Sequence, residues 1–250
     1  MNEIGELRDA PPPYGTVVFD CDSTLSAVEG IEELAQGNTE IARLTRDAME
    51  GRIALEDVFG KRLAMVRPTR ADLERVGERY VEALLPNAPR LVAALRSLGK
   101  RVCIVSGGLL PAVRHVARAL ELPDSDVFAV DLRFDAEGRY AGFDEGSPLA
   151  QARGKIPVVR DLRRPGERLA LIGDGATDLE AAPEADRFVA FGGVERRPRV
   201  LEAARVRCLE PDFRSLAPLL LSSDEIATLA RSPAHGALFQ PPRSIKPPTA

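Results

Sequence analysis

The sequence has no tryptophan, only three cysteines and no apolar run long enough to cross a membrane. The cysteines, Cys21, Cys103 and Cys208, are far apart and have no CxxC spacing, so they indicate neither a disulfide framework nor a zinc site. The apolar cluster LAPLLL at 216–221 is much shorter than a transmembrane helix, and the first residues, MNEIGELRDAPPPYG, lack the apolar segment of a secretory signal. We therefore expect a soluble protein of the reducing cytoplasm without a membrane partner.

An excess of charge of one sign is also absent. Lys+Arg 34 and Asp+Glu 38 are interspersed along the chain and give a net charge of −4, which does not favour binding to nucleic acid. Only four of the basic residues are lysines, so a lysine among other polar groups needs a reason. A hydrophobic content of 44% over 250 residues is enough for a large core. We expect a folded protein with no nucleic-acid partner.

Short β-branched runs alternate with helical patterns along most of the chain. We predict strands at Thr16–Phe19, 101–105, 169–172 and Arg187–Phe191, and helices at 88–98, 112–122 and 156–162. This alternation is typical of an α/β protein with a doubly wound parallel sheet, a Rossmann-like core, which we assign to residues 15–26 and 87–231.

Four segments depart from this core pattern. Residues 27–86 contain one helical pattern after another, which predicts an α-helical insertion after the first strand. Residues 127–143 contain two alternating runs around Asp-Ala-Glu-Gly, which predict a hairpin. The N-terminal arm at 1–14 and the Pro-rich tail at 232–250 are rich in residues that favour turns, and we expect both to be flexible.

Polar groups follow three of the predicted strands. Asp20 and Asp22 come after the first strand, SGG at 106–108 after the second and GDGATD at 173–178 after the third, while Lys155 begins the helix before that third strand. Because ligands bind beyond the carboxyl ends of strands in open α/β sheets, we expect these groups to meet. Singly, each fits a turn or a helix cap, and GDGATD lacks the spacing of a dinucleotide or P-loop motif. Together, in this order, they indicate one site.

The residue types in these groups suit a phosphate ester bound beside a metal ion. Asp20 and Asp174 offer the hard oxygen ligands that Mg²⁺ prefers, and the metal would offset the repulsion between carboxylates. Ser106, Gly107 and Gly108, just before a predicted helix, offer a hydroxyl and accessible backbone N–H groups to an anion.

The same groups predict a two-step phosphoryl transfer. Asp20 is our candidate nucleophile, which would form an aspartyl-phosphate. Asp22, two residues on, is the candidate acid that protonates the leaving alkoxide and the base that then deprotonates water. Lys155 would balance the charge of the phosphate and the carboxylates.

At these residues the chain resembles the haloacid dehalogenase superfamily, through VVFDCDSTL at 17–25, Ser106, the lysine and GDGATD. It is more similar still to the phosphoserine phosphatase branch, in LIGDGATDLEAAPEADRFVAFGG at 171–193 and YAGFDEGSP at 140–148. The resemblance spans about residues 17–220. It implies a HAD-like fold with residues 27–86 as a helical cap that sets specificity. It also implies Mg²⁺-dependent hydrolysis of O-phosphoserine, a step of serine biosynthesis, by a monomer or homodimer whose partner is a small phosphorylated amino acid.

The resemblance implies roles for further residues. Glu29 and Arg62 fall where the family places the side chains that hold the amino and carboxylate groups of serine. Without the resemblance, Glu29 fits an acid in the first turn of a helix and Arg62 fits a solvated helix residue. Met49 would line the substrate pocket, and Thr177 would touch the substrate or its phosphate. The implied metal ligands are the carboxylates of Asp20 and Asp174 and the main-chain carbonyl of Asp22, with Asp178 in the outer shell.

The family's lysine motif is the least well matched. Here it is QARGKIPVV, so either Arg153 or Lys155 could stand at the lysine position. We choose Lys155, because the apolar residues at +3, +4 and +7 after it match the helix of the family.

Three alternatives stay open from the sequence. The enzyme could act on another small phosphomonoester, such as phosphothreonine or phosphohomoserine, or pass the phosphoryl group to an alcohol other than water. A non-catalytic module that binds a phosphorylated metabolite is disfavoured, because Asp20, Asp22, Lys155 and Asp174 are all present.

Overall fold

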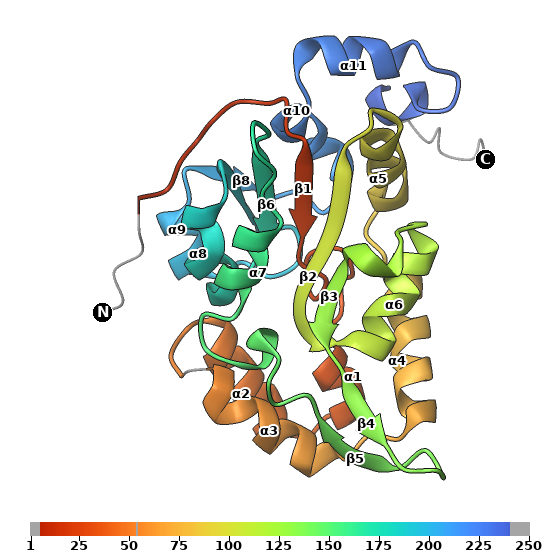
Figure 1. The fold of residues 1–250 in the computed structure, drawn as a ribbon, viewed down its shortest axis with the longest axis vertical. Helices are drawn as coiled ribbons and strands as arrows, with labels where there is room; N and C mark the ends of the chain where they lie inside the picture. The colour runs from red at the N-terminus through yellow and green to blue at the C-terminus, as the bar shows by residue number, and fades with distance from the viewer. Residues whose placement is uncertain (1–5, 54, 241–250) are drawn as a thin grey trace, which may run out of the picture.

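A six-stranded parallel sheet forms the centre of the protein (Figure 1). The computed structural model describes residues 6–53 and 55–240. The strands of the sheet are β1 (Thr16–Phe19), β2 (Arg101–Leu109), β3 (Val127–Val130), β6 (Leu169–Gly173), β7 (Arg187–Phe191) and β8 (Val206–Cys208). Their spatial order is β3-β2-β1-β6-β7-β8. The chain therefore adds strands on one side of β1 and then on the other, which makes the carboxyl end of β1 the switch point where ligands bind in such sheets.

The helices lie on both faces of the sheet and beyond its carboxyl and amino ends (Figure 1). They are α1 (Gly30–Ala35), α2 (Thr39–Met49), α3 (Leu55–Val66), α4 (Arg70–Glu82), α5 (Ala88–Ser97), α6 (Leu110–Ala119), α7 (Lys155–Asp161), α8 (Ala176–Ala181), α9 (Pro198–Ala203), α10 (Ala217–Leu220) and α11 (Ser223–Ala230). Helices α5 and α6 cover one face, and α7 and α8 cover the other (Figure 1).

The alternation of side chains along each strand builds two apolar layers. In β1, Val17 and Phe19 belong to the layer shared with α5, α6 and α10, whereas Val18 belongs to the layer shared with α7 and α8. All four residues of β1 are buried, because both faces of the sheet are covered. This double burial explains why the strand is a continuous apolar run.

The segment between β1 and α5 contains the helices α1 to α4. Helix α4 runs beside α6 of the core, and Gly77 permits the close approach, since a Cβ there would lie 2.4 Å from the His115 ring. Helices α2 and α3 lie beyond the carboxyl edge of the sheet, next to the hairpin (Figure 1).

The predicted hairpin at 127–143 is only partly right. Residues Val127–Val130 form β3, which pairs in parallel with β2 in the main sheet. The hairpin itself consists of β4 (Leu132–Phe134) and β5 (Tyr140–Phe143), which pair antiparallel. Burial of Val127 and Val130 against the core outweighs local pairing with the hairpin.

Both chain ends pack on the core over the residues that the structure describes. In the N-terminal arm, Leu7 is buried and the Asp9 carboxylate pairs with Arg187 at 2.7 Å. Near the C-terminus, Leu238 is 2% exposed, and buried Lys100 donates to the carbonyl of Tyr14 and to the Glu225 carboxylate of α11. Residues 6–14 and 232–240 are thus held by tertiary contacts.

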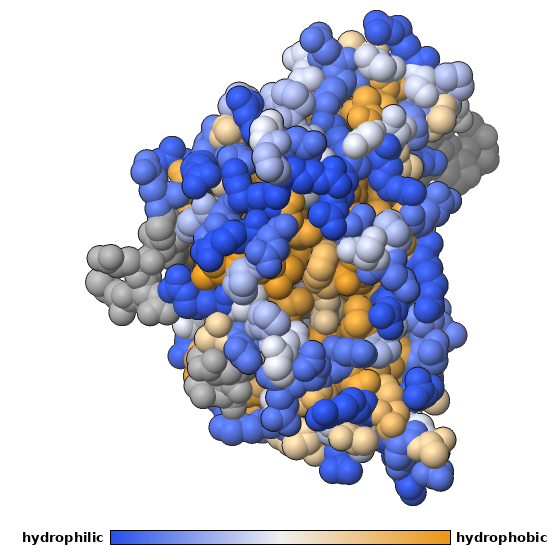
Figure 2. Space-filling model, in the orientation of Figure 1, coloured by the Kyte–Doolittle hydropathy of each residue, from blue (hydrophilic) through white to orange (hydrophobic). Residues whose placement is uncertain are grey.

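The visible face of the molecule is mostly hydrophilic, with apolar residues gathered near its centre (Figure 2). Within the described ranges, no helix has the length and apolar character needed to cross a membrane.

Candidate active site

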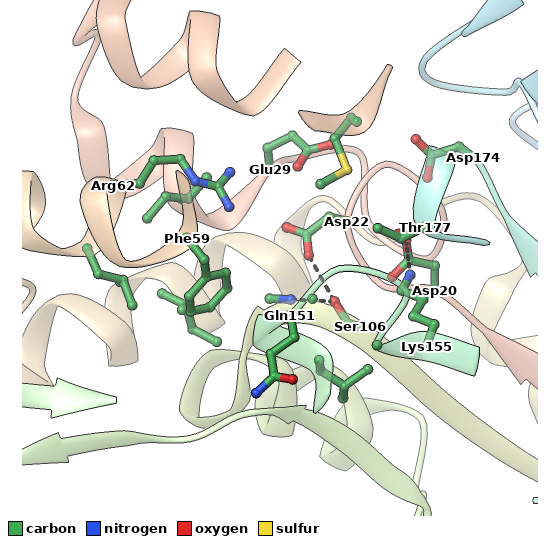
Figure 3. A pocket seen from close by; sticks show the side chains of 18 residues that line it. Asp20, Asp22, Glu29, Phe59, Arg62, Ser106, Gln151, Lys155, Asp174 and Thr177 are labelled. Carbon is green, nitrogen blue, oxygen red and sulfur yellow. Dashed lines mark hydrogen bonds and ion pairs between the residues drawn. The ribbon is translucent and has the colours of Figure 1, made fainter. Parts of the chain in front are cut away.

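One pocket at the carboxyl edge of the sheet brings together the residues predicted from widely separated segments (Figure 3). Of the predicted site residues, all but Asp178 line it. The lining comprises Asp20, Asp22, Glu29, Ile31, Met49, Phe59, Arg62, Leu63, Ser106, Gly107, Gly108, Leu109, Leu149, Gln151, Gly154, Lys155, Asp174 and Thr177. The helical insertion contributes one wall and the strand ends the other.

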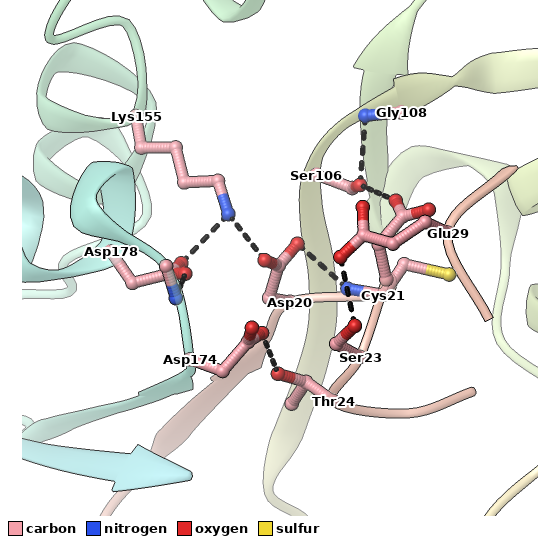
Figure 4. A network of polar contacts seen from close by, with 12 residues as sticks. Asp20, Cys21, Ser23, Thr24, Glu29, Ser106, Gly108, Lys155, Asp174 and Asp178 are labelled. Carbon is pink, nitrogen blue, oxygen red and sulfur yellow. Dashed lines mark hydrogen bonds and ion pairs between the residues drawn. The ribbon is translucent and has the colours of Figure 1, made fainter. Parts of the chain in front are cut away.

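Lys155 joins two carboxylates at the base of the pocket (Figure 4). Its Nζ lies 2.9 Å from Asp20 Oδ2 and 2.7 Å from Asp178 Oδ1, and all three residues are buried. Burial alone would lower the pKa of Lys155, but the Asp178 and Asp20 carboxylates outweigh it and hold the pKa above its ordinary value. The ammonium is therefore a fixed positive charge beside the candidate nucleophile. Arg153, the alternative, is exposed and lies outside the pocket lining.

The carboxyl group of Asp22 accepts three hydrogen bonds. Its Oδ1 accepts from the Gly30 N–H at 2.8 Å and from the Tyr80 hydroxyl at 2.5 Å, and its Oδ2 accepts from Ser106 Oγ at 3.1 Å. Burial, together with the nearby Glu29 and Asp20 carboxylates, raises the pKa of Asp22 to about 7. A carboxyl group with this pKa can both give and take a proton near neutral pH.

Ser106, Gly107 and Gly108 lie within β2, which continues to Leu109 instead of ending before them. Ser106 Oγ accepts the Gly108 N–H at 2.9 Å. A Cβ at Gly108 would lie 2.7 Å from Asp22 Oδ2, so only glycine leaves room between the strand and that carboxylate. The strand end therefore presents backbone and hydroxyl to the pocket.

Three buried carboxylates form a site that fits a divalent cation. One oxygen from each of Asp20, Asp174 and Asp178 lies within 4.8 Å of the others. The donors are hard oxygens, as Mg²⁺ prefers, and Asp174 is further oriented by Thr24 Oγ1, which donates to it at 2.7 Å. The position of Asp178 behind Lys155 and outside the pocket lining is compatible with an outer-shell role.

Glu29 and an unpredicted residue, Arg197, lie together at the rim of this cluster. Glu29 Oε1 accepts from Ser23 Oγ at 2.8 Å and from the Arg197 guanidinium at 3.2 Å. Burial raises the pKa of Glu29, and Arg197 opposes that shift. Arg197 also forms an ion pair with Asp174, so one buried guanidinium joins the candidate metal site to the candidate ammonium site.

Arg62 is a buried cation for which the described part of the chain supplies no ion-pair partner. It is 4% exposed, donates to Thr45 Oγ1 at 3.0 Å and lies 5.8 Å from the centroid of the Phe59 ring. Its Nε has no hydrogen-bond partner among the residues that the structure describes. Burial lowers the pKa of Arg62, opposed by the more distant carboxylates of Glu29, Asp22 and Glu32. A buried guanidinium in this state has an open place for an anion.

Met49 and Thr177 take the positions expected of lining residues. Met49 ends α2, and its sulfur faces the GDGATD segment, 3.4 Å from where a Cβ on Gly175 would lie. Thr177 lies in the first turn of α8 and points into the pocket (Figure 3). The roles of these residues, like those of the other predicted site residues, remain predictions.

Two functional candidates escaped the sequence prediction. Arg197 follows β7 within FGGVERR, so the rule that ligands gather at strand ends could have found it. Tyr80 continues a helical apolar stripe with Leu73 and Val76, and such a stripe gives no sign that one hydroxyl reaches an acid.

Comparison with known proteins finds relatives that are similar to this chain in sequence and in fold. Residues 17–183 match the family of haloacid dehalogenase-like hydrolases. The phosphoserine phosphatase of Mus musculus is 39% identical over 210 residues, which cover 82% of this chain and 93% of that protein.

Solved structures agree with this match. A phosphoserine phosphohydrolase-like protein from Francisella tularensis superposes with a TM-score of 0.75 at 26% identity, covering 82% of this chain and 99% of the other. A phospho-aspartyl intermediate analogue of phosphoserine phosphatase superposes with a TM-score of 0.73 at 25% identity, covering 84% and 100%. The chain belongs to the haloacid dehalogenase-like hydrolase family, in the branch of its phosphoserine phosphatase relatives.

Proposed function

We propose that this chain hydrolyses O-phosphoserine to serine and phosphate, with Mg²⁺ and through a phospho-Asp20 intermediate. Its similarity to phosphoserine phosphatases supports the substrate, and its similarity to a phospho-aspartyl intermediate analogue of such an enzyme supports the intermediate. The phosphorylated amino acid is its small-molecule partner, and serine biosynthesis in the cytoplasm is the expected setting.

The observation that carries the proposal is the unpaired charge of Arg62 across the pocket from the Asp20 cluster. Phosphoserine has an anion at each end and an ammonium near one of them. The Arg62 guanidinium complements the carboxylate of phosphoserine, and the Glu29 carboxylate complements its ammonium. Lys155 and the Ser106 segment complement its phosphate. The pocket thus offers a complementary group to each charge of this substrate.

In the first step, an Asp20 oxygen attacks phosphorus as the bond to the serine oxygen breaks. Asp22 gives its proton to that departing oxygen, so serine leaves as a neutral alcohol. Lys155 holds the Asp20 carboxylate in place and offsets negative charge on the phosphoryl group. Asp20, Asp174 and the carbonyl of Asp22 would hold Mg²⁺, which would supply further positive charge to the phosphoryl group.

In the second step, a water attacks the phosphorus of phospho-Asp20. Asp22, now a carboxylate, takes a proton from this water, and the Asp20–phosphorus bond breaks. The step releases phosphate and restores both aspartates, so one acid serves twice without a net proton change.

We further propose residues 27–86 as a cap that sets specificity, and 15–26 with 87–231 as the catalytic core. The cap supplies Glu29, Met49, Phe59 and Arg62 to the pocket, whereas the core supplies the groups around Asp20. We propose that the protein acts as a monomer or a homodimer.

Release of phosphate from phosphoserine with Mg²⁺, and its loss in EDTA, tests the activity. Absence of phosphate release between pH 5 and 9 would refute it. A panel with phosphothreonine, phosphohomoserine and uncharged phosphomonoesters at equal concentration tests the substrate. A larger kcat/KM for any of these than for phosphoserine would reassign it.

A further inference from the structure

A buried tyrosine of the helical insertion contacts the candidate acid. Tyr80 is 0% exposed, and its hydroxyl donates to Asp22 Oδ1 at 2.5 Å. It lies outside the pocket lining, so it does not face the substrate. Burial raises the pKa of Tyr80, which keeps its hydroxyl protonated and able to donate at any working pH.

We propose that Tyr80 is a positioning residue that orients the carboxyl group of Asp22 for proton transfer to the departing serine oxygen. The inference rests on the proposed function and assigns to α4 a part in the chemistry. It follows from how the two oxygens of Asp22 are occupied.

Oδ1 of Asp22 is fully engaged by donors, and Oδ2 faces the reaction. The Tyr80 hydroxyl and the Gly30 N–H both donate to Oδ1, whereas Oδ2 accepts one hydrogen bond, from Ser106 Oγ, so Oδ2 is the oxygen with room for the proton that Asp22 carries. Oδ2 lies beside Ser106 and Gly108, on the strand segment that faces the pocket. Without Tyr80, a single backbone donor would remain on Oδ1, and the carboxyl group could rotate or exchange its two oxygens.

Tyr80 is fixed to the segment that carries Asp22. Ser26 Oγ donates to the Tyr80 carbonyl at 3.0 Å, and Ser26 forms an antiparallel bridge with Leu84. The Ala27 N–H donates to the carbonyl of Ala83 at 2.9 Å. The end of α4 and the loop after β1 are therefore joined by main-chain and side-chain hydrogen bonds.

The other end of α4 is fixed to the core. Gly77 lies against the His115 ring of α6, and Glu74 contacts His115 Nε2 at 2.9 Å. Position 30 is a glycine, and a Cβ there would lie 2.1 Å from the Tyr80 hydroxyl oxygen. Glycine at position 30 thus makes room for the tyrosine oxygen beside Asp22.

In the step concerned, the bond from phosphorus to the serine oxygen breaks as an Asp20 oxygen bonds to phosphorus. The departing oxygen takes the proton from Asp22 Oδ2, and the electron pair of that O–H bond stays on the carboxylate. A phosphate ester of a good leaving group, such as 4-nitrophenyl phosphate, undergoes the same transfer with little need of this proton. The two substrates therefore separate proton donation from the rest of the reaction.

Tyr80→Phe, which removes only the hydroxyl, tests the proposal. The burst of first product, serine or 4-nitrophenolate, reports the rate at which Asp20 is phosphorylated. We expect this rate to fall ~10- to 100-fold with phosphoserine, part of the ~10²- to 10⁴-fold that general acid catalysis contributes, and less than ~3-fold with 4-nitrophenyl phosphate. The KM for phosphoserine should stay within ~3-fold, because Tyr80 does not face the substrate.

Tyr14→Phe is the matched control. Tyr14 is also buried, and its hydroxyl donates to a backbone carbonyl, that of Ala10, at 2.6 Å in the N-terminal arm. This variant should leave both burst rates unchanged. Comparing two substrates on one preparation also cancels any loss of folded protein, because a smaller folded fraction lowers both amplitudes equally.

Equal slowing of both substrates by Tyr80→Phe, or an unchanged rate with phosphoserine, would overturn the assignment of Tyr80. Failure of the wild-type protein to release serine from phosphoserine would instead overturn the proposed function. The two failures are thus told apart by the wild-type reaction.

Discussion

Replacing Arg62 by methionine should make the empty protein more stable and a worse catalyst. Methionine keeps a flexible unbranched stem and much of the apolar volume of the side chain, but it is shorter and removes the charge. In the structure Arg62 is 4% exposed, and among the described residues its guanidinium donates to the Thr45 hydroxyl and lies over the Phe59 ring. The substrate's carboxylate is the missing partner in our proposal.

The catalytic loss follows from the hydrogen bonds that the guanidinium would give. Two charge-assisted hydrogen bonds to a carboxylate contribute ~1.5–3 kcal/mol each, so their removal should cost ~3–6 kcal/mol of substrate binding. This corresponds to a fall in kcat/KM for phosphoserine of at least ~10²-fold. For an uncharged phosphomonoester, which has no carboxylate, the change should stay below ~3-fold.

The gain in stability follows from desolvation. Burying an unpaired charge costs several kcal/mol, whereas the Thr45 hydrogen bond and the Phe59 contact together return ~2 kcal/mol. The substitution removes the buried charge together with the Thr45 hydrogen bond and the Phe59 contact. The free energy of unfolding should therefore rise by ~1–3 kcal/mol. In a chain of 250 residues, that is a rise in Tm of ~2–12 °C.

Steady-state kinetics and thermal unfolding of the same preparations measure both effects. Arg75→Met, on the exposed side of α4, is a control that removes a solvated arginine and should change neither quantity much. Serine should raise the Tm of the wild type more than that of Arg62→Met, because at a given ligand concentration the stabilisation grows with the logarithm of affinity. A lower Tm with an unaltered KM for phosphoserine would refute the reasoning, since Arg62 would then be a structural cation.

Three further predictions concern the Asp20 cluster. Asp20→Asn should abolish turnover and trapping of phosphoenzyme while preserving the fold; retained turnover would show that another group attacks phosphorus. Lys155→Ala should lower kcat by ~10²- to 10³-fold, whereas Arg153→Ala, which changes an exposed side chain, should stay within ~2-fold, and the reverse result would exchange the two assignments. The pKa of Asp22 is about 7 in the folded protein and 3.8 in the unfolded chain, so the folded state binds this proton more tightly. The proton on Asp22 therefore stabilises the fold fully below pH ~4, and this stabilisation is lost as the pH rises to ~7. Unfolding of metal-free protein in EDTA should show this loss in the wild type, and Asp22→Asn should show a smaller slope; equal slopes would contradict the assigned shift.

The sequence by itself determined the sheet and the groups at its edge. Strands Thr16–Phe19 and Arg187–Phe191 have the predicted bounds, because strands buried on both faces must be short apolar runs. Parallel strands place all their carboxyl ends at one edge, so Asp20 and Asp174 had to lie near each other once their strands were found. The resemblance added Glu29 and Arg62, which local pattern alone would have left as a first-turn acid and a solvated helix residue.

Tertiary structure alone decided the partners of these groups. Turn preference suggested that β2 would end before Ser106, but pairing with β3 carries the strand on to Leu109. Tyr80 reaches Asp22 from 58 residues away, and Arg197 reaches Glu29 from 168 away. Helical periodicity tells which face of a helix is buried but not against what. Which hydroxyl or guanidinium meets an acid is fixed only when α4 packs on α6 and the loop after β7 folds over the strand ends.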